Sequence, residues 1–145
     1  MRAAGLTLAA VFAIALIASR GEAADGARTA AATFGKALVT AHADALRPIL
    51  PEHGRVHLTL IRLGPEEGLF GAQQVEALFR DFLVRGTVSS FDVSRCEGEP
   101  RGAATAHATA AITDREGRSG RIALHLGFEQ EGGRWVLREV KETAE

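Results

Sequence analysis

The chain has 145 residues, 46% of them hydrophobic, and its 17 basic and 18 acidic residues leave a formal net charge of −1. Such a balanced charge gives no basic surface to attract nucleic acid or an anionic membrane, so neither is expected as a partner of the mature protein. The single cysteine, Cys96, excludes an intramolecular disulfide, and the length suits one domain with a sizeable core.

The first 23 residues are predicted to be a signal peptide. Met1 and Arg2 give a positive start, residues 3–18 are mostly apolar, and Gly21 and Ala23 place small residues where a signal peptidase cleaves. As a helix the apolar run spans about 24 Å, less than the roughly 30 Å core of a bilayer, which favours a cleaved signal over a permanent anchor. We therefore expect cleavage after Ala23, a periplasmic or secreted protein, and a single domain over residues 24–145.

Two helices are predicted at the start of this domain. Residues 27–41 place alanines and larger apolar residues on one face of a helix, with basic residues pointing away. Asp44 is expected to cap a second, short helix over residues 45–50, which Pro51 ends.

Residues 69–86 predict the helix around which the core is organised. Five apolar residues recur at spacings of three and four, which places them in one stripe of an α-helix and leaves Glu76 and Arg80 facing water. They are Val75, Leu78, Phe79, Phe82 and Leu83. Gly86 is expected to end this helix in the left-handed conformation. A stripe this apolar requires a sheet to cover it.

From residue 55 the apolar residues alternate with a period of two, which predicts strands separated by turns that contain glycine. The expected strands are residues 55–61, 69–70, 87–96, 103–113, 121–129 and 134–142. Short breaks separate the last three strands, so these are expected to form an antiparallel meander. The order of elements predicts an α+β fold in which three helices from the N-terminal half pack on one face of a curved, mainly antiparallel sheet.

This order of elements resembles the nuclear transport factor 2-like superfamily, whose cystatin-like α+β domain is shaped like a cone. Residues 68–75, GLFGAQQV, are similar to the family's entry into its long helix, and residues 133–137, GRWVL, are similar to its closing strand. The chain looks most like small exported bacterial members of unknown function that consist of this domain alone. Motifs of this kind specify a fold and leave the function open.

The resemblance implies a conical pocket between the helices and the sheet, and in some members an isomerase, cyclase or dehydratase activity in that pocket. Isomerase-type chemistry needs a carboxylate base together with a hydroxyl or a protonated acid that holds the oxyanion. This chain has no tyrosine, and Asp92 and Glu129 alternate away from the apolar rows beside them. No catalytic residue, metal site or cofactor is therefore predicted.

Histidines form two candidate sites. His107 and His125 are expected to be neighbours on the outer face of a hairpin, either as a metal or proton site or, more simply, as solvated or interface imidazoles. His53 and His57 have the four-residue spacing of a zinc-binding helix, but Gly54 and the strand pattern that follows disfavour a helix there.

Arg62 and Arg95 are the candidate ligand-binding residues. Both share the parity of the inner apolar rows, so their guanidinium groups are expected at the pocket mouth, where they would bind a carboxylate in a forked pair. The alternative is that both side chains point outward and pair with Glu66 or Glu97. Cys96 is interpreted as a small buried residue because a reactive thiol needs an exposed, positive setting.

These observations predict a non-catalytic domain that binds a small apolar or acidic ligand, or a partner, through the cone pocket. An isomerase, cyclase or dehydratase in the same pocket is the alternative, and a structural dimerisation module is a third. A homodimer through the outer face of the sheet is expected, because small side chains cover that face. These are Ala103, Thr105, Ala111 and Ala123.

Overall fold

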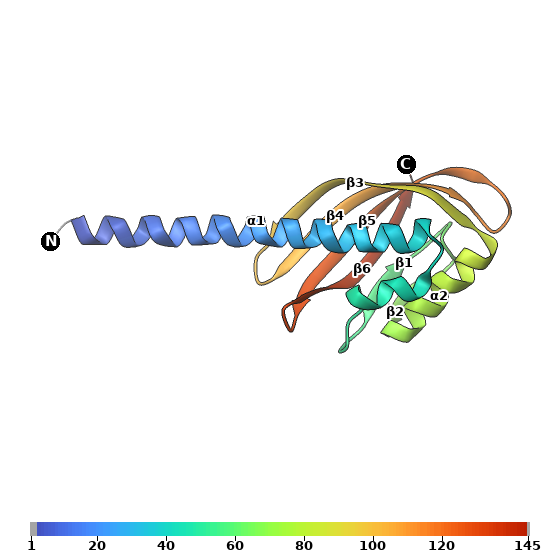
Figure 1. Cartoon of the computed structure of the whole chain (residues 1–145), viewed down its shortest axis with the longest axis horizontal. Helices are drawn as coiled ribbons and strands as arrows, with labels where there is room; N and C mark the ends of the chain where they lie inside the picture. Colours follow the sequence, from blue (N-terminus) through green and yellow to red (C-terminus); the bar gives the residue numbers. More distant parts are fainter. Residues whose placement is uncertain (1–2, 145) are drawn as a thin grey trace.

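Three helical segments cover one face of a six-stranded sheet (Figure 1). The computed structural model describes residues 3–144, with side chains described over residues 21–143. The helical segments are α1 (Ala3–Val39), η1 (Ala43–Ile49) and α2 (Ala72–Arg85). The strands are β1 (Val56–Thr59), β2 (Glu67–Phe70), β3 (Thr87–Glu99), β4 (Ala103–Thr113), β5 (Ser119–Glu131) and β6 (Arg134–Ala144). The predicted α+β class is confirmed.

Helix α1 begins well before residue 27, where the first helix was expected, and runs without a break through Ala23. It ends at Val39, where Ala41 takes a positive φ of 57°. The N–H of Ala41 then donates to the carbonyl of Leu38, and that of His42 to Ala37, which is the hydrogen-bond pattern of a Schellman helix end. Met1 and Arg2 of the predicted signal peptide lie outside the described residues. Within the described chain, no helix is long and apolar enough to cross a membrane.

The short helix that was expected over residues 45–50, with Asp44 as its cap, is a 3₁₀ helix that starts two residues earlier. It starts after His42, which makes no side-chain capping bond, and Asp44 lies in its first turn. Pro48 lies inside this short segment, and a proline ring there disfavours regular α-helical hydrogen bonds.

The sheet has the strand order β2-β1-β6-β5-β4-β3, so the last strand of the chain lies in its interior. Strands β4 to β6 form the predicted antiparallel meander, and β3 extends it by pairing antiparallel with β4. The β1 strand pairs antiparallel with β2 and parallel with β6, with Leu58 opposite Val140. This single parallel pairing joins the N-terminal hairpin to the end of the chain.

Helix α2 matches the predicted long helix but differs from it in two details. Glu76 is 9% exposed and not left to water. Gly86 has a φ of −123° and is therefore extended, not left-handed. Its lack of a side chain serves close packing, because a Cβ there would lie 2.7 Å from the Phe82 ring and 2.8 Å from the carbonyl oxygen of Thr113.

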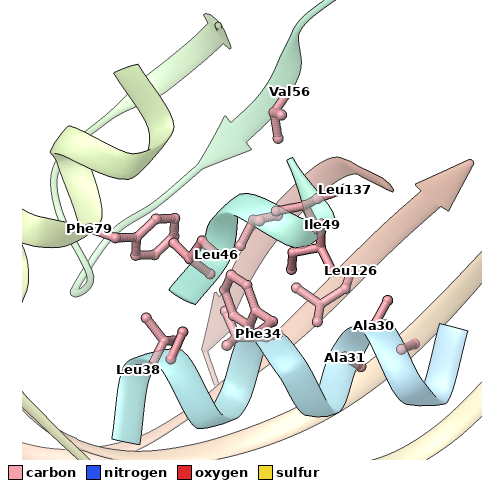
Figure 2. Close-up of a cluster of buried hydrophobic side chains, with 14 of the residues drawn as sticks. Ala30, Ala31, Phe34, Leu38, Leu46, Ile49, Val56, Phe79, Leu126 and Leu137 are labelled. Carbon is pink, nitrogen blue, oxygen red and sulfur yellow. The ribbon is translucent and has the colours of Figure 1, made fainter. Parts of the chain in front are cut away.

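The space between the helices and the sheet is filled by large side chains. Figure 2 shows Phe34 of α1, Leu46 of η1 and Phe79 of α2 meeting there, and all three are fully buried. The Phe34 and Phe79 rings are perpendicular, with their centroids 5.5 Å apart. The interior where the resemblance implied a conical pocket is packed here with aromatic and aliphatic side chains.

A β-bulge changes which face the second half of β3 presents. Val93 pairs with Ala108, and the next pair joins Arg95 to His107, so Ser94 is left over. An extra residue reverses the alternation of side chains beyond it. As a result Arg95 lies on the outer face, beside His107, and Cys96 packs against the core.

Candidate functional site: an arginine pocket beside η1 and α2

A cavity of about 570 Å³ lies between η1, the residues that follow it, α2 and the start of β6. Its apolar surface comes from Leu50, Pro51 and Ala72. Its polar surface comes from Gln73, Glu52 and the four residues described next, Arg47, Glu76, Arg80 and Arg134. We call this cavity the arginine pocket. Its volume lies within the range of about 300–1,000 Å³ that is usual for small-molecule sites.

Glu76 stands between two of the guanidinium groups. Its Oε1 accepts Arg47 Nε at 2.5 Å, and its Oε2 accepts Arg80 Nη2 at 2.8 Å and Arg47 Nη2 at 3.3 Å. The hydrogen bond from Arg47 lowers the pKa of Glu76 below its usual value, against the opposing effect of burial. Glu76 is therefore ionised at neutral pH and holds both arginines at the pocket.

Helix geometry explains part of this arrangement. Glu76 and Arg80 are four residues apart on α2, so their side chains lie one above the other on one face of the helix. Arg47 reaches the same carboxylate from η1, and in return the bond to Glu76 raises the pKa of Arg47. The Arg80 side chain is 54% exposed, so most of its N–H donors still face the pocket and solvent.

Arg134 closes the pocket on the β6 side. Its Nη1 donates to the carbonyl oxygen of Pro48 at 2.9 Å and its Nη2 to that of Leu50 at 3.2 Å. The neighbouring Glu131 accepts the N–H of Glu52 at 2.8 Å, a bond that lowers the pKa of Glu131. These contacts tie the end of η1 to the β5–β6 turn and fix the wall of the pocket.

The pocket is suited to bind an anion that carries a small apolar body. Guanidinium groups bind carboxylates through paired hydrogen bonds, and the apolar residues of the floor offer contact to the rest of such a molecule. Glu76 is a poor candidate for a general base, since a base works best with a pKa near neutral pH and this carboxylate has a lowered one with both oxygens already bonded.

The structure places Arg62 and Arg95 apart from this pocket and from each other. Arg62 follows β1, and its Nη2 donates to Asp114 Oδ2 at 3.3 Å and to the carbonyl oxygen of Arg118 at 2.9 Å. Arg95 was expected on the inner face, and that position is wrong because of the bulge at Ser94. Its guanidinium instead contacts Glu97 at 3.0 Å, the outward pairing given as the alternative.

The expected neighbourhood of His107 and His125 is confirmed, with ring centroids 4.8 Å apart. Burial, followed by the charges of Arg95 and His125, lowers the pKa of His107. His125 and His57 both lie near the carboxylate of Glu139, at 3.5 Å and 3.3 Å. Over the described residues, no three His, Cys, Asp or Glu side chains are grouped so that they could hold a metal ion.

The other two sequence candidates do not form sites of their own. His57 is in strand β1 and the carbonyl oxygen of His53 accepts a bond from Arg138, so the pair has no helical geometry. The Cys96 thiol is partly buried, and burial raises its pKa, which disfavours the reactive thiolate.

Sequence reasoning missed the arginine pocket. The pair Glu76 and Arg80 has a recognisable four-residue spacing, but it was assigned to the solvated face of the helix. Arg47 and Arg134 join the pocket through the tertiary fold, and neither stands in a motif with the other two. The sequence did show a charged pair next to the apolar stripe of the helix. Such a pair is also typical of a solvent-exposed helix surface with no binding site.

No protein-family model and no curated protein matches the chain. Solved structures with a similar fold do exist. A DUF4783 family protein from Bacteroides uniformis is 14% identical with a TM-score of 0.62, over 78% of this chain and 94% of that one. A ketosteroid isomerase-like protein from Erwinia carotovora atroseptica is 11% identical with a TM-score of 0.64, over 82% and 93%.

A third similar structure is a protein of unknown function with a cystatin-like fold from Nostoc punctiforme. It is 15% identical with a TM-score of 0.57, over 81% of this chain and 86% of that one. These likenesses show that the chain has the nuclear transport factor 2-like, or cystatin-like, fold expected from its sequence. At such low identity they show the fold alone, and the function has to be inferred from the site.

Proposed function

We propose that this protein is a non-catalytic domain that binds small organic acids in the arginine pocket. The observation that carries the proposal is the convergence of Arg47, Arg80 and Arg134 on one cavity of about 570 Å³ with an apolar floor. The ligand is a carboxylate with a short apolar body, whose acid group pairs with Arg80 at the exposed side of Glu76.

The proposal places the ligand beside the cone and not within it. The cone interior is occupied by Phe34, Phe79 and Phe82, which are fully buried. Catalysis of the isomerase, cyclase or dehydratase kind has less support, since Glu76 is engaged by two arginines and its pKa is lowered. For a protein that is exported, as we also propose from the N-terminal sequence, the ligands would be acids of the periplasm or the external medium.

The test is calorimetry with a panel of small carboxylates, such as benzoate, phenylacetate and octanoate, against wild type and Arg80→Gln. We expect at least one acid to bind wild type saturably and to bind Arg80→Gln about tenfold more weakly, a loss of about 1.4 kcal/mol. Arg85→Gln is the matched control, because Arg85 is an exposed residue of the same helix. Absence of binding by every acid, or equal binding by Arg80→Gln, would contradict the proposal.

A second proposed function, dimerisation, rests on the outer face of the sheet. Strand register places two rows of side chains next to each other across that face. One row is Arg95, His107, His125 and Lys141, and the other is Glu97, Thr105, Gly127 and Glu139. In a dimer whose twofold axis runs across the strands, midway between the two rows, each row would face the other row of the second copy. Arg95 would then lie opposite Glu97 of the second copy, and Lys141 opposite Glu139.

The dimer is tested by light scattering after size exclusion. Thr105→Arg adds a bulky charge in the middle of the face and is expected to yield monomers. Ala32→Arg, on the exposed side of α1, is the control and should leave a dimer. A wild-type protein that is monomeric at all accessible concentrations would contradict this proposal and leave the ligand proposal standing.

A further inference from the structure

Arg62 lies in a second, smaller cavity of about 170 Å³, between the β1–β2 loop and the turn that joins β4 to β5. Two more arginines, Arg115 and Arg118, line the same cavity together with Asp114 and Glu116. We call it the turn pocket. Its volume is less than a third of that of the arginine pocket, which suits an inorganic ion better than an organic acid.

The carboxylate of Asp114 holds two of these arginines in place. It is 2% exposed. Its Oδ1 accepts the N–H groups of Glu116 and Arg118, and its Oδ2 accepts Arg62 Nη2 at 3.3 Å. The same Oδ2 forms an ion pair with Arg118 Nε, also at 3.3 Å. The backbone bond from Arg118 contributes most to lowering the pKa of Asp114. Three hydrogen bonds and one ion pair therefore compensate the Asp114 charge and orient the guanidinium groups of Arg62 and Arg118.

Glu142 of β6 holds the loop that carries Arg62 through hydrogen bonds to its backbone. This buried carboxylate accepts the backbone N–H groups of Ile61, Arg62 and Leu63 at 2.8–3.0 Å. The Arg62 side chain passes directly over Gly120, where a Cβ would lie 2.4 Å from Arg62 Nη1. A larger residue at this position would therefore collide with the guanidinium group. The position of the Arg62 guanidinium is thus set before any ligand binds.

Arg115 supplies the feature that points to a ligand. Its Nη2 pairs with Asp81 Oδ2 of helix α2 at 2.8 Å. Its Nε is buried and, among the residues that the structure describes, has no hydrogen-bond partner. A buried N–H group without a partner is costly, and a guanidinium N–H is satisfied best by a charged acceptor.

We propose that the turn pocket binds a small tetrahedral oxyanion, phosphate or sulfate, between Arg62, Arg115 and Arg118. The anion accepts the Arg115 Nε–H and the guanidinium donors of Arg62 and Arg118 that Asp114 does not use. The carboxylate placed to oppose it is Glu116, whose contact with Arg118 is long at 3.6 Å. Asp81 neutralises part of Arg115 but is not among the residues that line the cavity. This site is independent of the proposed function.

The proposal is tested by following the arginine Nε–Hε signals of ¹⁵N-labelled protein during a titration with inorganic phosphate at constant ionic strength. The Arg115 signal, assigned from its loss in Arg115→Lys, is expected to shift saturably with phosphate and to remain unchanged with chloride. Sulfate is expected to compete. A shift that is absent, or equal for chloride, would overturn the proposal.

Two variants separate a built site from general charge attraction. Arg115→Lys keeps the positive charge but removes the Nε–H donor, and Arg118→Gln removes one guanidinium at an exposed position. Each is expected to weaken phosphate binding at least tenfold by calorimetry, and Arg85→Lys is expected to leave it unchanged. Arg80→Gln, in the arginine pocket, should also bind phosphate like wild type. Equal binding by both turn-pocket variants would overturn the proposal whatever the arginine pocket binds.

Discussion

The rings of Phe34 and Phe79 meet edge to face, with their planes at 90° and their centroids 5.5 Å apart. This contact joins α1 to α2 across the space that the conical fold would otherwise leave open (Figure 2). Both side chains are fully buried, so the contact excludes water as well as ligand. The pair therefore forms part of the packed core between α1, α2 and the sheet.

Replacement of Phe79 by alanine is expected to lower the free energy of unfolding by about 3–5 kcal/mol, because a large buried ring is lost and a cavity remains. The change is measured by urea denaturation. Val84→Ala, at a residue of the same helix that is 78% exposed, should change the stability by less than about 0.5 kcal/mol. Benzene should fill the cavity left in Phe79→Ala and raise the melting temperature of this variant but not that of wild type. If Phe79→Ala is as stable as wild type, Phe79 does not pack in the core as described.

Gly26 of α1 lies directly against the indole of Trp135, and a Cβ at this glycine would be 2.1 Å from Trp135 Nε1. Gly26→Ala is therefore expected to destabilise the protein by about 1–3 kcal/mol through overpacking, although alanine favours helix. Urea unfolding of a double-mutant cycle checks the cause. Trp135→Phe should cost less stability in the Gly26→Ala background than in wild type, and strictly additive effects would place the clash elsewhere.

Acid is expected to weaken the fold through Asp114. The pKa of this carboxyl is lowered in the folded state, chiefly by the backbone N–H of Arg118. Its contribution to stability is therefore complete above the ordinary carboxyl pKa of about 3.9 and is lost as the pH falls below that value toward the folded-state pKa. Glu76 and Glu131, whose pKa values are also lowered, act in the same direction.

Melting temperature measured from neutral pH down to about pH 2.5 tests this. Asp114→Asn should be less stable than wild type at neutral pH and should lose less stability on acidification. Asp92→Asn, at an exposed position on β3, serves as the control and should follow the wild-type curve. Parallel curves for wild type and Asp114→Asn would show that this carboxyl does not carry the acid sensitivity.

His107 is expected to titrate below the ordinary imidazole pKa of about 6.5, because burial and the nearby Arg95 and His125 disfavour its charged form. The midpoint is measured from the imidazole signals in NMR spectra. Arg95→Gln should raise the midpoint only in part, since burial is the largest cause and remains. If Arg95→Gln leaves the midpoint unchanged, the charge of Arg95 does not contribute to the lowered pKa of His107.

The predicted signal peptide gives a further expectation. Among the residues of α1 whose side chains are described, the fully buried ones, Ala27, Ala31, Phe34 and Ala37, follow the expected cleavage site at Ala23. Cleavage would remove only Ala23 from this described part of the core. Intact-mass measurement of the full-length gene product from a bacterial host should give a chain that starts at Ala24. A product that keeps its first 23 residues would contradict both cleavage and the proposed location.

Local periodicity was sufficient to predict the elements of this fold. The stripe of α2 and the alternation in β4 depend on spacings within one segment, and β4 has the predicted bounds, Ala103–Thr113. The β-bulge at Ser94 could not be predicted in this way, because one unpaired residue leaves the composition of the strand unchanged. Its effect was to move Arg95 from the expected inner face to the outer one.

The candidate sites were harder to predict because their residues come from distant parts of the chain. Glu76 looked like a solvated helix residue until Arg47 of η1 reached it from outside the helix. Arg62 was predicted at the mouth of the cone pocket, but it lies beside Arg115 and Arg118, which belong to the turn between β4 and β5. Periodicity indicates which face a residue lies on and does not indicate what it meets there.

The interior position of β6 means that the sheet cannot be completed before this strand has been synthesised. Residues Arg134–Ala144 supply both the partner of β5 and the only described partner, apart from β2, for β1. Trp135, in the same strand, packs against Gly26 near the other end of the domain. A nascent chain that lacks these last residues has an isolated β1–β2 hairpin and an uncovered stretch of α1. The sheet of this domain therefore forms only after β6 has been synthesised, because β6 pairs with both β1 and β5.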